Sequence, residues 1–223
     1  MIRHDSRAAL MTALAAQVAG ELRDALAAQP HATLAVPGGT TPGPFLAALS
    51  GAELDWARVR VMLTDERFVP ENSDRSNTRL LRATLLQGPA AAATMIPFWR
   101  QADAPEDVLD ALTTDIAASL PLDICVLGMG ADMHTASIFP GADRLEEALA
   151  PDAPPLLPMR APGAPEPRLT LTAPVLAAAR HLHVLIQGED KAEALAAAQA
   201  ATGTAEAPIR LALDAGATVH WAA

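Results

Sequence analysis

Two residues near the middle of the chain have the types and spacing of a general base and its partner. Asp132 and His134 stand two positions apart in the segment 128–134, Gly-Met-Gly-Ala-Asp-Met-His, which follows an apolar run. A carboxylate that orients a histidine favours its use as a general base near neutral pH. A solvated aspartate beside a structural histidine is the alternative interpretation of the same pattern.

Neither a dinucleotide nor a metal ion is expected in this segment. The segment begins like a dinucleotide-binding fingerprint, but Met133 stands where the third glycine of that fingerprint would be. Two possible metal ligands, without a further histidine or cysteine cluster, are too few for a metal site.

The segment 37–42, Pro-Gly-Gly-Thr-Thr-Pro, has the composition of a phosphate-binding turn. Gly38 and Gly39 allow a close approach of the backbone, and free N–H groups at the start of a following helix suit an anion. Thr40 and Thr41 add hydroxyl donors. An ordinary turn capped by a threonine would have the same composition, and no Walker A lysine follows.

Charged residues after a second apolar run offer further ligands. Arg67, in Asp65-Glu66-Arg67, could clamp a phosphate, and the acidic residues could bind sugar hydroxyls. A surface cluster of salt bridges explains the same residues equally well. Lys191 is the only lysine among 16 Lys and Arg residues, which hints at a special role but is as readily explained by chance. The other histidines are interpreted as structural: His4, His31, His181, His183 and His220.

Short apolar runs alternate with helical patterns along the chain. We expect strands at 31–36, 59–63, 94–98, 122–127, 168–172, 182–187 and 217–222. We expect helices at 6–28, 42–49, 76–86, 104–119, 173–180 and 189–201. The polar segment 64–75 and the segment 151–167, with seven prolines, are expected to be loops. This order predicts one domain over residues 1–223, an α/β, Rossmann-like fold whose mostly parallel sheet has helices on both faces.

In such folds, ligands bind beyond the carboxyl ends of the strands. Polar or glycine-rich segments follow four of the expected strands, at 37–42, 64–68, 128–135 and 188–191. We therefore expect these segments to converge on one site.

Composition limits the partners of the chain. The 223 residues have a net charge of −10, no tyrosine and only 3% aromatic residues. This argues against nucleic acid and against an anionic membrane surface. The single cysteine, Cys125, fits a reducing compartment, and no apolar run reaches the roughly 18 residues of a membrane helix. A cytoplasmic location is expected.

Five segments, taken in order, resemble the 6-phosphogluconolactonase family, within the glucosamine-6-phosphate deaminase and ribose-5-phosphate isomerase superfamily. Segment 37–42 is similar to its phosphate loop, and 64–70 with Ser76 and Asn77 to its second signature. Segment 127–141, Leu-Gly-Met-Gly-Ala-Asp-Met-His-Thr-Ala-Ser-Ile-Phe-Pro-Gly, is the most specific match. Segments 168–172 and 188–191 complete the series.

The resemblance implies hydrolysis of a phosphorylated sugar lactone, without a cofactor or a metal. His134 would take a proton from the water that attacks the lactone carbonyl, and Asp132 would orient His134. Arg67 would assist in phosphate binding, and Asp65 would face the sugar. The residues implied as the main phosphate ligands are Gly38, Gly39, Thr40, Arg168 and Lys191.

Two other functions compete with this one. Deaminases of the superfamily carry a glutamate five residues after the histidine, where this chain has Phe139. A non-catalytic sugar-phosphate sensor would be expected to carry a DNA-binding module and a basic surface, which the sequence does not indicate.

Met133 stands where the family commonly has glycine. If residues 132–134 are extended, their side chains alternate, and Met133 points away from the side of Asp132 and His134. The alternative is a left-handed backbone at Met133, as glycine would allow, which costs a methionine roughly 1–2 kcal/mol. We predict the simpler solution, a negative φ at Met133 with its side chain packed in an apolar gap.

Overall fold

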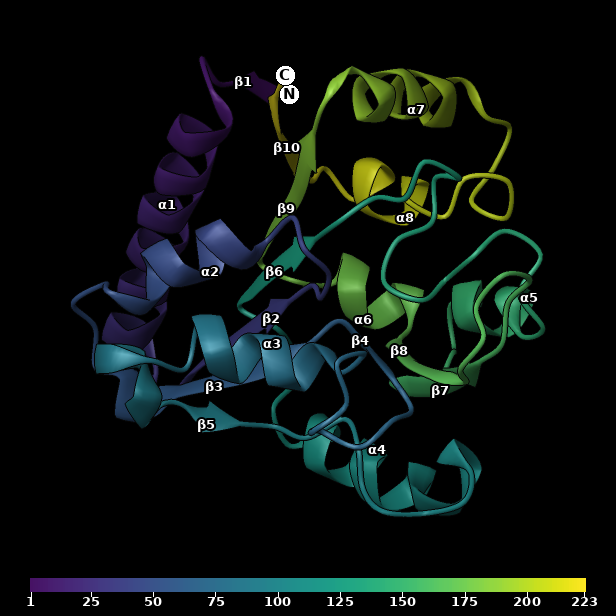
Figure 1. Cartoon of the computed structure of the whole chain (residues 1–223), viewed down its shortest axis with the longest axis horizontal. Helices are drawn as coiled ribbons and strands as arrows, with labels where there is room; N and C mark the ends of the chain where they lie inside the picture. Colours follow the sequence, from purple (N-terminus) through teal and green to yellow (C-terminus); the bar gives the residue numbers. More distant parts are fainter.

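The computed structural model describes residues 1–223 and is built around a seven-stranded sheet (Figure 1). All neighbouring strands in this sheet are parallel, which confirms the predicted α/β fold. In spatial order the strands are β1 (Ile2–Arg3), β10 (Thr218–Ala222), β9 (His181–Gln187), β6 (Ile124–Leu127), β2 (Ala32–Val36), β3 (Val59–Leu63) and β5 (Thr94–Met95).

The central strands are continuous apolar runs because helices cover both faces of the sheet. Every residue of β2 and β6 is buried, as expected for a parallel sheet between two helical layers. Helices α1, α2 and α3 gather on one side, and α6, α7 and α8 on the other (Figure 1). The helices are α1 (Arg7–Ala28), α2 (Gly43–Ser50), α3 (Asn77–Thr84), α4 (Leu109–Ala117), α5 (Leu145–Leu149), α6 (Ala173–Ala177), α7 (Glu189–Ala200) and α8 (Arg210–Asp214).

The longest helix, α1, follows directly from its sequence. The Ser6 hydroxyl caps it by accepting a hydrogen bond from the Ala9 N–H at 3.1 Å. Leu10, Leu14, Val18 and Leu22, spaced four residues apart, are fully buried and form its inner face. No helix of the structure is long and apolar enough to span a bilayer.

A second sheet corrects two of the sequence predictions. It contains β4 (Asp65–Arg67), β8 (Arg168–Leu171) and β7 (Leu156–Met159), paired antiparallel in the order β4-β8-β7. The predicted loops at 64–75 and 151–167 were therefore wrong in part, since each contains a strand. Pro158 is tolerated in β7 because this strand pairs on one side only, so its missing N–H breaks no second ladder. The strand predicted at 168–172 exists but belongs to this sheet.

Shorter elements differ from the predictions mainly in length. The strand expected at 94–98 is reduced to two residues, and the helix expected at 104–119 is divided into a 3-10 turn (Pro105–Val108) and α4. Two further 3-10 turns cover Trp56–Arg58 and Gly88–Ala92. The sequence analysis did not predict β1, α5 or α8, which are two to five residues long. Strand β1 pairs with β10, so both ends of the chain lie together (Figure 1).

Candidate active site

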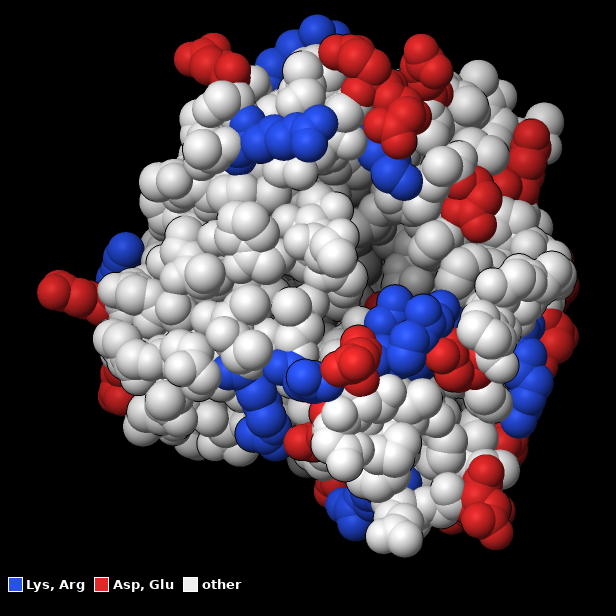
Figure 2. Space-filling model, viewed as in Figure 1, with Lys and Arg blue, Asp and Glu red and all other residues white.

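The segments expected to converge do so around one cavity of about 320 Å³. It lies at the carboxyl ends of the central strands, where the prediction placed it. Figure 2 shows a hollow near the middle of this face, with Lys and Arg side chains gathered at its lower rim. The predicted site residues that line the cavity are Gly38, Gly39, Thr40, Thr41, Asp65, Arg67, His134, Arg168 and Lys191. Asp132 does not line it but contacts His134.

The loop between β2 and α2 presents backbone donors to the cavity. The N–H groups of Gly38, Gly39 and Thr40 make no hydrogen bond within the protein, so they are free to bind an anion. Gly39 has a φ of 89°, which favours glycine. Gly38 is required for a different reason: a Cβ at this position would lie 2.0 Å from Cγ of Asn77. The close neighbour that explains this glycine is thus a protein side chain.

Two arginines lie side by side at one end of the cavity. Arg67 in β4 is the register partner of Arg168 in β8. The Nε atoms of both are buried and have no hydrogen-bond partner within the protein. Burial lowers the pKa of Arg168, although the carboxylate of Asp65, 3.7 Å from its Nη1, opposes this shift. Two neighbouring cations that line one cavity favour an anionic ligand there.

Asp65 is held by the same sheet. It is buried, and its Oδ2 accepts a hydrogen bond of 2.6 Å from the Ser137 hydroxyl. The backbone N–H of Ser137 in turn donates to Oγ1 of Thr170 in β8. Ser137 therefore links the loop that carries His134 to Asp65, a contact that the sequence analysis did not identify.

Glu66 is a buried carboxylate that holds together the elements that carry the site residues. Its two oxygens accept hydrogen bonds from the backbone N–H groups of Arg67, Asn77 and Thr78 and from the Ser76 hydroxyl. Burial raises the pKa of Glu66 despite these bonds. The contacts tie β4 to the start of α3 and place Asn77 at the cavity wall. Asn77 was quoted in a signature of the sequence but not predicted as a site residue.

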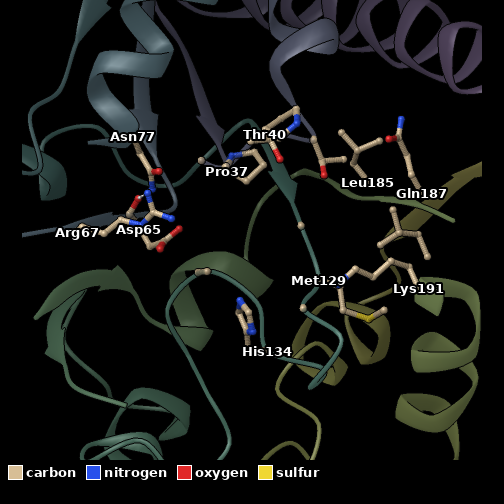
Figure 3. Close-up of a pocket in the computed structure, with 18 of the residues that line it drawn as sticks. Pro37, Thr40, Asp65, Arg67, Asn77, Met129, His134, Leu185, Gln187 and Lys191 are labelled. Atoms are coloured by element: carbon tan, nitrogen blue, oxygen red, sulfur yellow. Dashed lines mark hydrogen bonds between the residues drawn. The ribbon is translucent and has the colours of Figure 1, made fainter. Parts of the chain in front are cut away.

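His134 and Asp132 form the expected pair. Nδ1 of His134 lies 2.5 Å from Oδ1 of Asp132, and the Asp132 side chain is half exposed. Partial burial works to raise the pKa of Asp132, but the charge and hydrogen bonds of His134 outweigh it and hold this pKa below its ordinary value. With Nδ1 bound to a carboxylate, Nε2 is assigned as the unprotonated nitrogen. Nε2 has no partner within the protein, and the ring lies at the cavity (Figure 3).

The backbone of this loop corrects the prediction for Met133. Met133 has a φ of 65°, and Ala136 a φ of 49°, so both adopt the left-handed conformation that glycine prefers. At Met133 the reason is a tight turn, in which Met133 N donates to Gly130 O and Gly130 N donates to His134 O. This turn folds Asp132 and His134 over Gly130, where a Cβ would lie 2.1 Å from Nδ1 of His134. As predicted, the Met133 side chain packs against the core and does not line the cavity.

Lys191 lies across the cavity from Arg67, with His134 between them in the view of Figure 3. It belongs to the first turn of α7. Gln187, at the end of β9, lines the same side of the cavity and was not predicted. No three His, Cys, Asp or Glu side chains are grouped in a way that could hold a metal ion.

Comparisons with known proteins agree with this geometry. A model of the family "Glucosamine-6-phosphate isomerases/6-phosphogluconolactonase" matches residues 5–221. The 6-phosphogluconolactonase of Rhizobium meliloti is 47% identical over 98% of this chain and 96% of its own. That of Pseudomonas aeruginosa is 46% identical over 93% of this chain and 88% of its own.

Solved structures show the same relationship. A crystal structure of a 6-phosphogluconolactonase from Shewanella baltica has a TM-score of 0.95 and 33% identity, over 99% of this chain and 96% of the other. A putative 6-phosphogluconolactonase from Neisseria gonorrhoeae has a TM-score of 0.90 and 35% identity, over 100% and 98% of the two chains. The chain belongs to the family of glucosamine-6-phosphate isomerases and 6-phosphogluconolactonases.

Proposed function

We propose that this chain hydrolyses 6-phospho-D-glucono-1,5-lactone to 6-phosphogluconate, with His134 as the general base. The observation that carries this proposal is the free Nε2 of His134, at a cavity whose end is lined by the two cations Arg67 and Arg168. A base next to an anion site suits a substrate with an electrophilic carbon and a phosphate. The names of the relatives supply the identity of that substrate.

In the proposed mechanism, Nε2 of His134 removes a proton from water as the water oxygen attacks the lactone carbonyl. Asp132 accepts a hydrogen bond from Nδ1–H, stays ionised, and stabilises the imidazolium that forms. When the tetrahedral intermediate collapses, the bond from C1 to the ring oxygen breaks. His134 returns the proton to that oxygen, and the product is a hydroxy acid that ionises at neutral pH.

The substrate phosphate is assigned to the free N–H groups of Gly38, Gly39 and Thr40 and to the side chains of Arg168 and Lys191. Arg67, which also lines the cavity, assists with its guanidinium charge. Thr41 adds a hydroxyl at the cavity wall, and Asp65 faces the sugar. We propose further that residues 1–223 act as one domain in the cytoplasm, without a cofactor, a nucleic acid partner or a membrane.

Deamination or isomerisation of an amino-sugar phosphate is the nearest alternative within the family. Position 139, where the deaminases carry a glutamate, holds Phe139 here, and its ring packs on His134 with 4.1 Å between centroids. Ring-opening acid–base chemistry would lack that carboxylate. A binding module without catalysis would have no use for the His134 and Asp132 pair.

A pH-stat assay separates these functions. The native protein is added to freshly generated 6-phosphogluconolactone, and the uncatalysed rate of acid release is subtracted. We expect rapid acid release from this lactone, slow release from gluconolactone without phosphate, and no ammonia from glucosamine 6-phosphate. Ammonia release without lactone hydrolysis would establish the deaminase instead, and inactivity on every substrate would support a binding module.

A further inference from the structure

Phe139 contacts both groups on which the proposed reaction depends. Its ring centroid lies 4.1 Å from that of His134, with the two planes tilted by 33°. Cζ of Arg168 lies over the same phenyl ring, 5.2 Å from its centroid. Phe139 is half-buried, packs against the core and does not line the cavity. It therefore reaches the reaction only through His134 and Arg168.

The Asp132 contact alone leaves the imidazole of His134 incompletely fixed. One hydrogen bond, from Nδ1 to Oδ1, restrains one corner of the ring, while the ring can still turn about that bond. The Asp132 side chain is 55% exposed, so water competes for it. A phenyl ring packed at 4.1 Å supplies the missing restraint, because it allows only a narrow range of tilts of the imidazole plane.

The charge distribution of a phenyl ring suits both neighbours. Its face carries a partial negative charge that attracts cations such as a guanidinium. The same attraction applies to the imidazolium that forms when His134 accepts a proton. Arg168 also depends on this contact, since Asp65 at 3.7 Å is its only ion-pair partner and its Nε has no acceptor.

We propose that Phe139 is a positioning residue that sets the plane of His134 and holds Arg168 in place beside it. The proposal rests on the proposed function, because His134 is taken as the base and Arg168 as a phosphate ligand. Through one ring, a phosphate bound by Arg168 also restrains the group that moves the proton.

Two variants of Phe139 separate the ring from its bulk. Phe139→Leu keeps an apolar side chain but removes the ring face, and Phe139→Tyr keeps the ring. We expect Phe139→Leu to lower kcat roughly 10-fold, because a displaced base is less effective, and to raise KM about 3-fold through Arg168. Phe139→Tyr should restore both constants to within about 2-fold of the native values, since the ring face is retained.

Phe98→Leu is the matched control. Phe98 is fully buried, follows β5 and does not line the cavity. Its loss should lower the melting temperature more than Phe139→Leu does, while kcat and KM stay within about 2-fold of native, since Phe98 does not line the cavity. A drop in kcat in both Leu variants in proportion to lost stability would overturn the proposal, because Phe139 would then be merely structural.

Proton NMR tests the geometry without any assay. In the native protein the ring protons of His134 should be shifted upfield by the phenyl ring, and Phe139→Leu should abolish the shift. Without an upfield shift in the native protein, the proposal is wrong even if Phe139→Leu fails to fold. If the native protein does not hydrolyse the lactone, the proposed function fails, while the NMR result still judges the packing of Phe139 on His134.

Discussion

Two of the histidine–carboxylate pairs in the molecule have similar distances but lie in very different settings. Nδ1 of His134 lies 2.5 Å from Asp132, and Nε2 of His183 lies 2.9 Å from Glu21. The side chain of His134 is 29% exposed, but that of His183 only 2%. Distance to a carboxylate therefore does not distinguish a candidate base from a structural histidine.

The second ring nitrogen makes the distinction. Nδ1 of His183 lies 3.2 Å from Nε2 of His220, whose Nδ1 lies 3.4 Å from Nε2 of His4. When Glu21 is ionised, it accepts a hydrogen bond from Nε2 of His183. Nδ1 of His183 then accepts from Nε2 of His220, and Nδ1 of His220 accepts from Nε2 of His4. Neither His183 nor His220 has a free nitrogen. In His134, by contrast, Nε2 is unpaired at the cavity. Of the two paired histidines, only His134 has a free nitrogen at the cavity with which to take a proton from water.

Neutralising the two carboxylates should produce the largest contrast between the pairs. Asp132→Asn should lower kcat roughly 100-fold, because an amide can bind His134 in the wrong tautomer. Glu21→Gln should leave kcat within about 2-fold of the native value. It should lower the melting temperature, because the buried His183 loses its charged hydrogen-bond partner. Steady-state kinetics and thermal unfolding of both variants check this. Equal effects of the two substitutions on kcat would remove the distinction drawn here.

Removing the cations tests the anion site at the same cavity. Lys191→Ala and Arg168→Ala should each raise KM, because each removes roughly 2–3 kcal/mol of charge-assisted hydrogen bonding to the phosphate. The effect on kcat should be smaller. Arg180→Ala, at an exposed arginine outside this cavity, is the control and should leave KM unchanged. Native enzyme with the same kcat/KM for gluconolactone as for the phosphorylated lactone would argue against the site.

The buried histidines should make stability depend on pH. Burial, together with the charges of His183 and His4, lowers the pKa of His220 from 6.5 to about 4. Between these two values the unfolded chain binds more protons, so the free energy of unfolding should fall as the pH drops from 6.5 towards 4, by on the order of 3 kcal/mol. Burial raises the pKa of Glu21, but His183 outweighs this effect and holds the pKa below its ordinary value. Glu21 therefore also makes the free energy of unfolding fall as the pH drops.

Thermal unfolding at pH 7 and pH 5 measures this effect. His220→Gln should flatten the pH dependence, because glutamine does not titrate in this range. If the melting temperatures of the native and His220→Gln proteins depend on pH in the same way, the buried histidines do not control stability in acid.

The smallest effect is expected at Met133. Glycine would relieve a left-handed backbone worth about 1–2 kcal/mol, but it would lose side-chain packing and add about 0.4–1 kcal/mol of chain entropy. The free energy of unfolding should therefore change by less than about 1 kcal/mol, and kcat/KM by a few-fold at most. Ala136→Gly, with little packing to lose, should stabilise the protein slightly. Denaturant unfolding that shows a loss above about 3 kcal/mol in Met133→Gly would contradict this balance.

Much of the fold was readable because buried strands and amphipathic helices are local patterns. The apolar runs of β2, β3 and β6 and the four-residue spacing in α1 gave these elements directly. The second sheet was not readable, since β4 consists of three charged residues whose burial depends on distant partners. Strand β7 contains a proline and stands among residues that favour loops.

The candidate site was partly predictable for the same reason. Glycines, threonines and the Asp132–His134 pair stand at strand ends, and the fold brings such ends together. For the positive φ at Met133, the only signal in the sequence was the glycine that the family commonly has there, because the conformation itself follows from hydrogen bonds that close the turn from Gly130 to His134. The roles of Glu66 and Phe139 also depend on neighbours that the sequence does not place.

The most direct test of the central claim is the kcat of His134→Ala on 6-phosphogluconolactone, measured by pH-stat with the uncatalysed rate subtracted. We predict a loss of at least about 100-fold, the usual effect of removing a general base. The melting temperature should change little, because His134 lies in a loop and its side chain is not part of the buried core. A folded variant that keeps half of the native kcat would exclude His134 as the base.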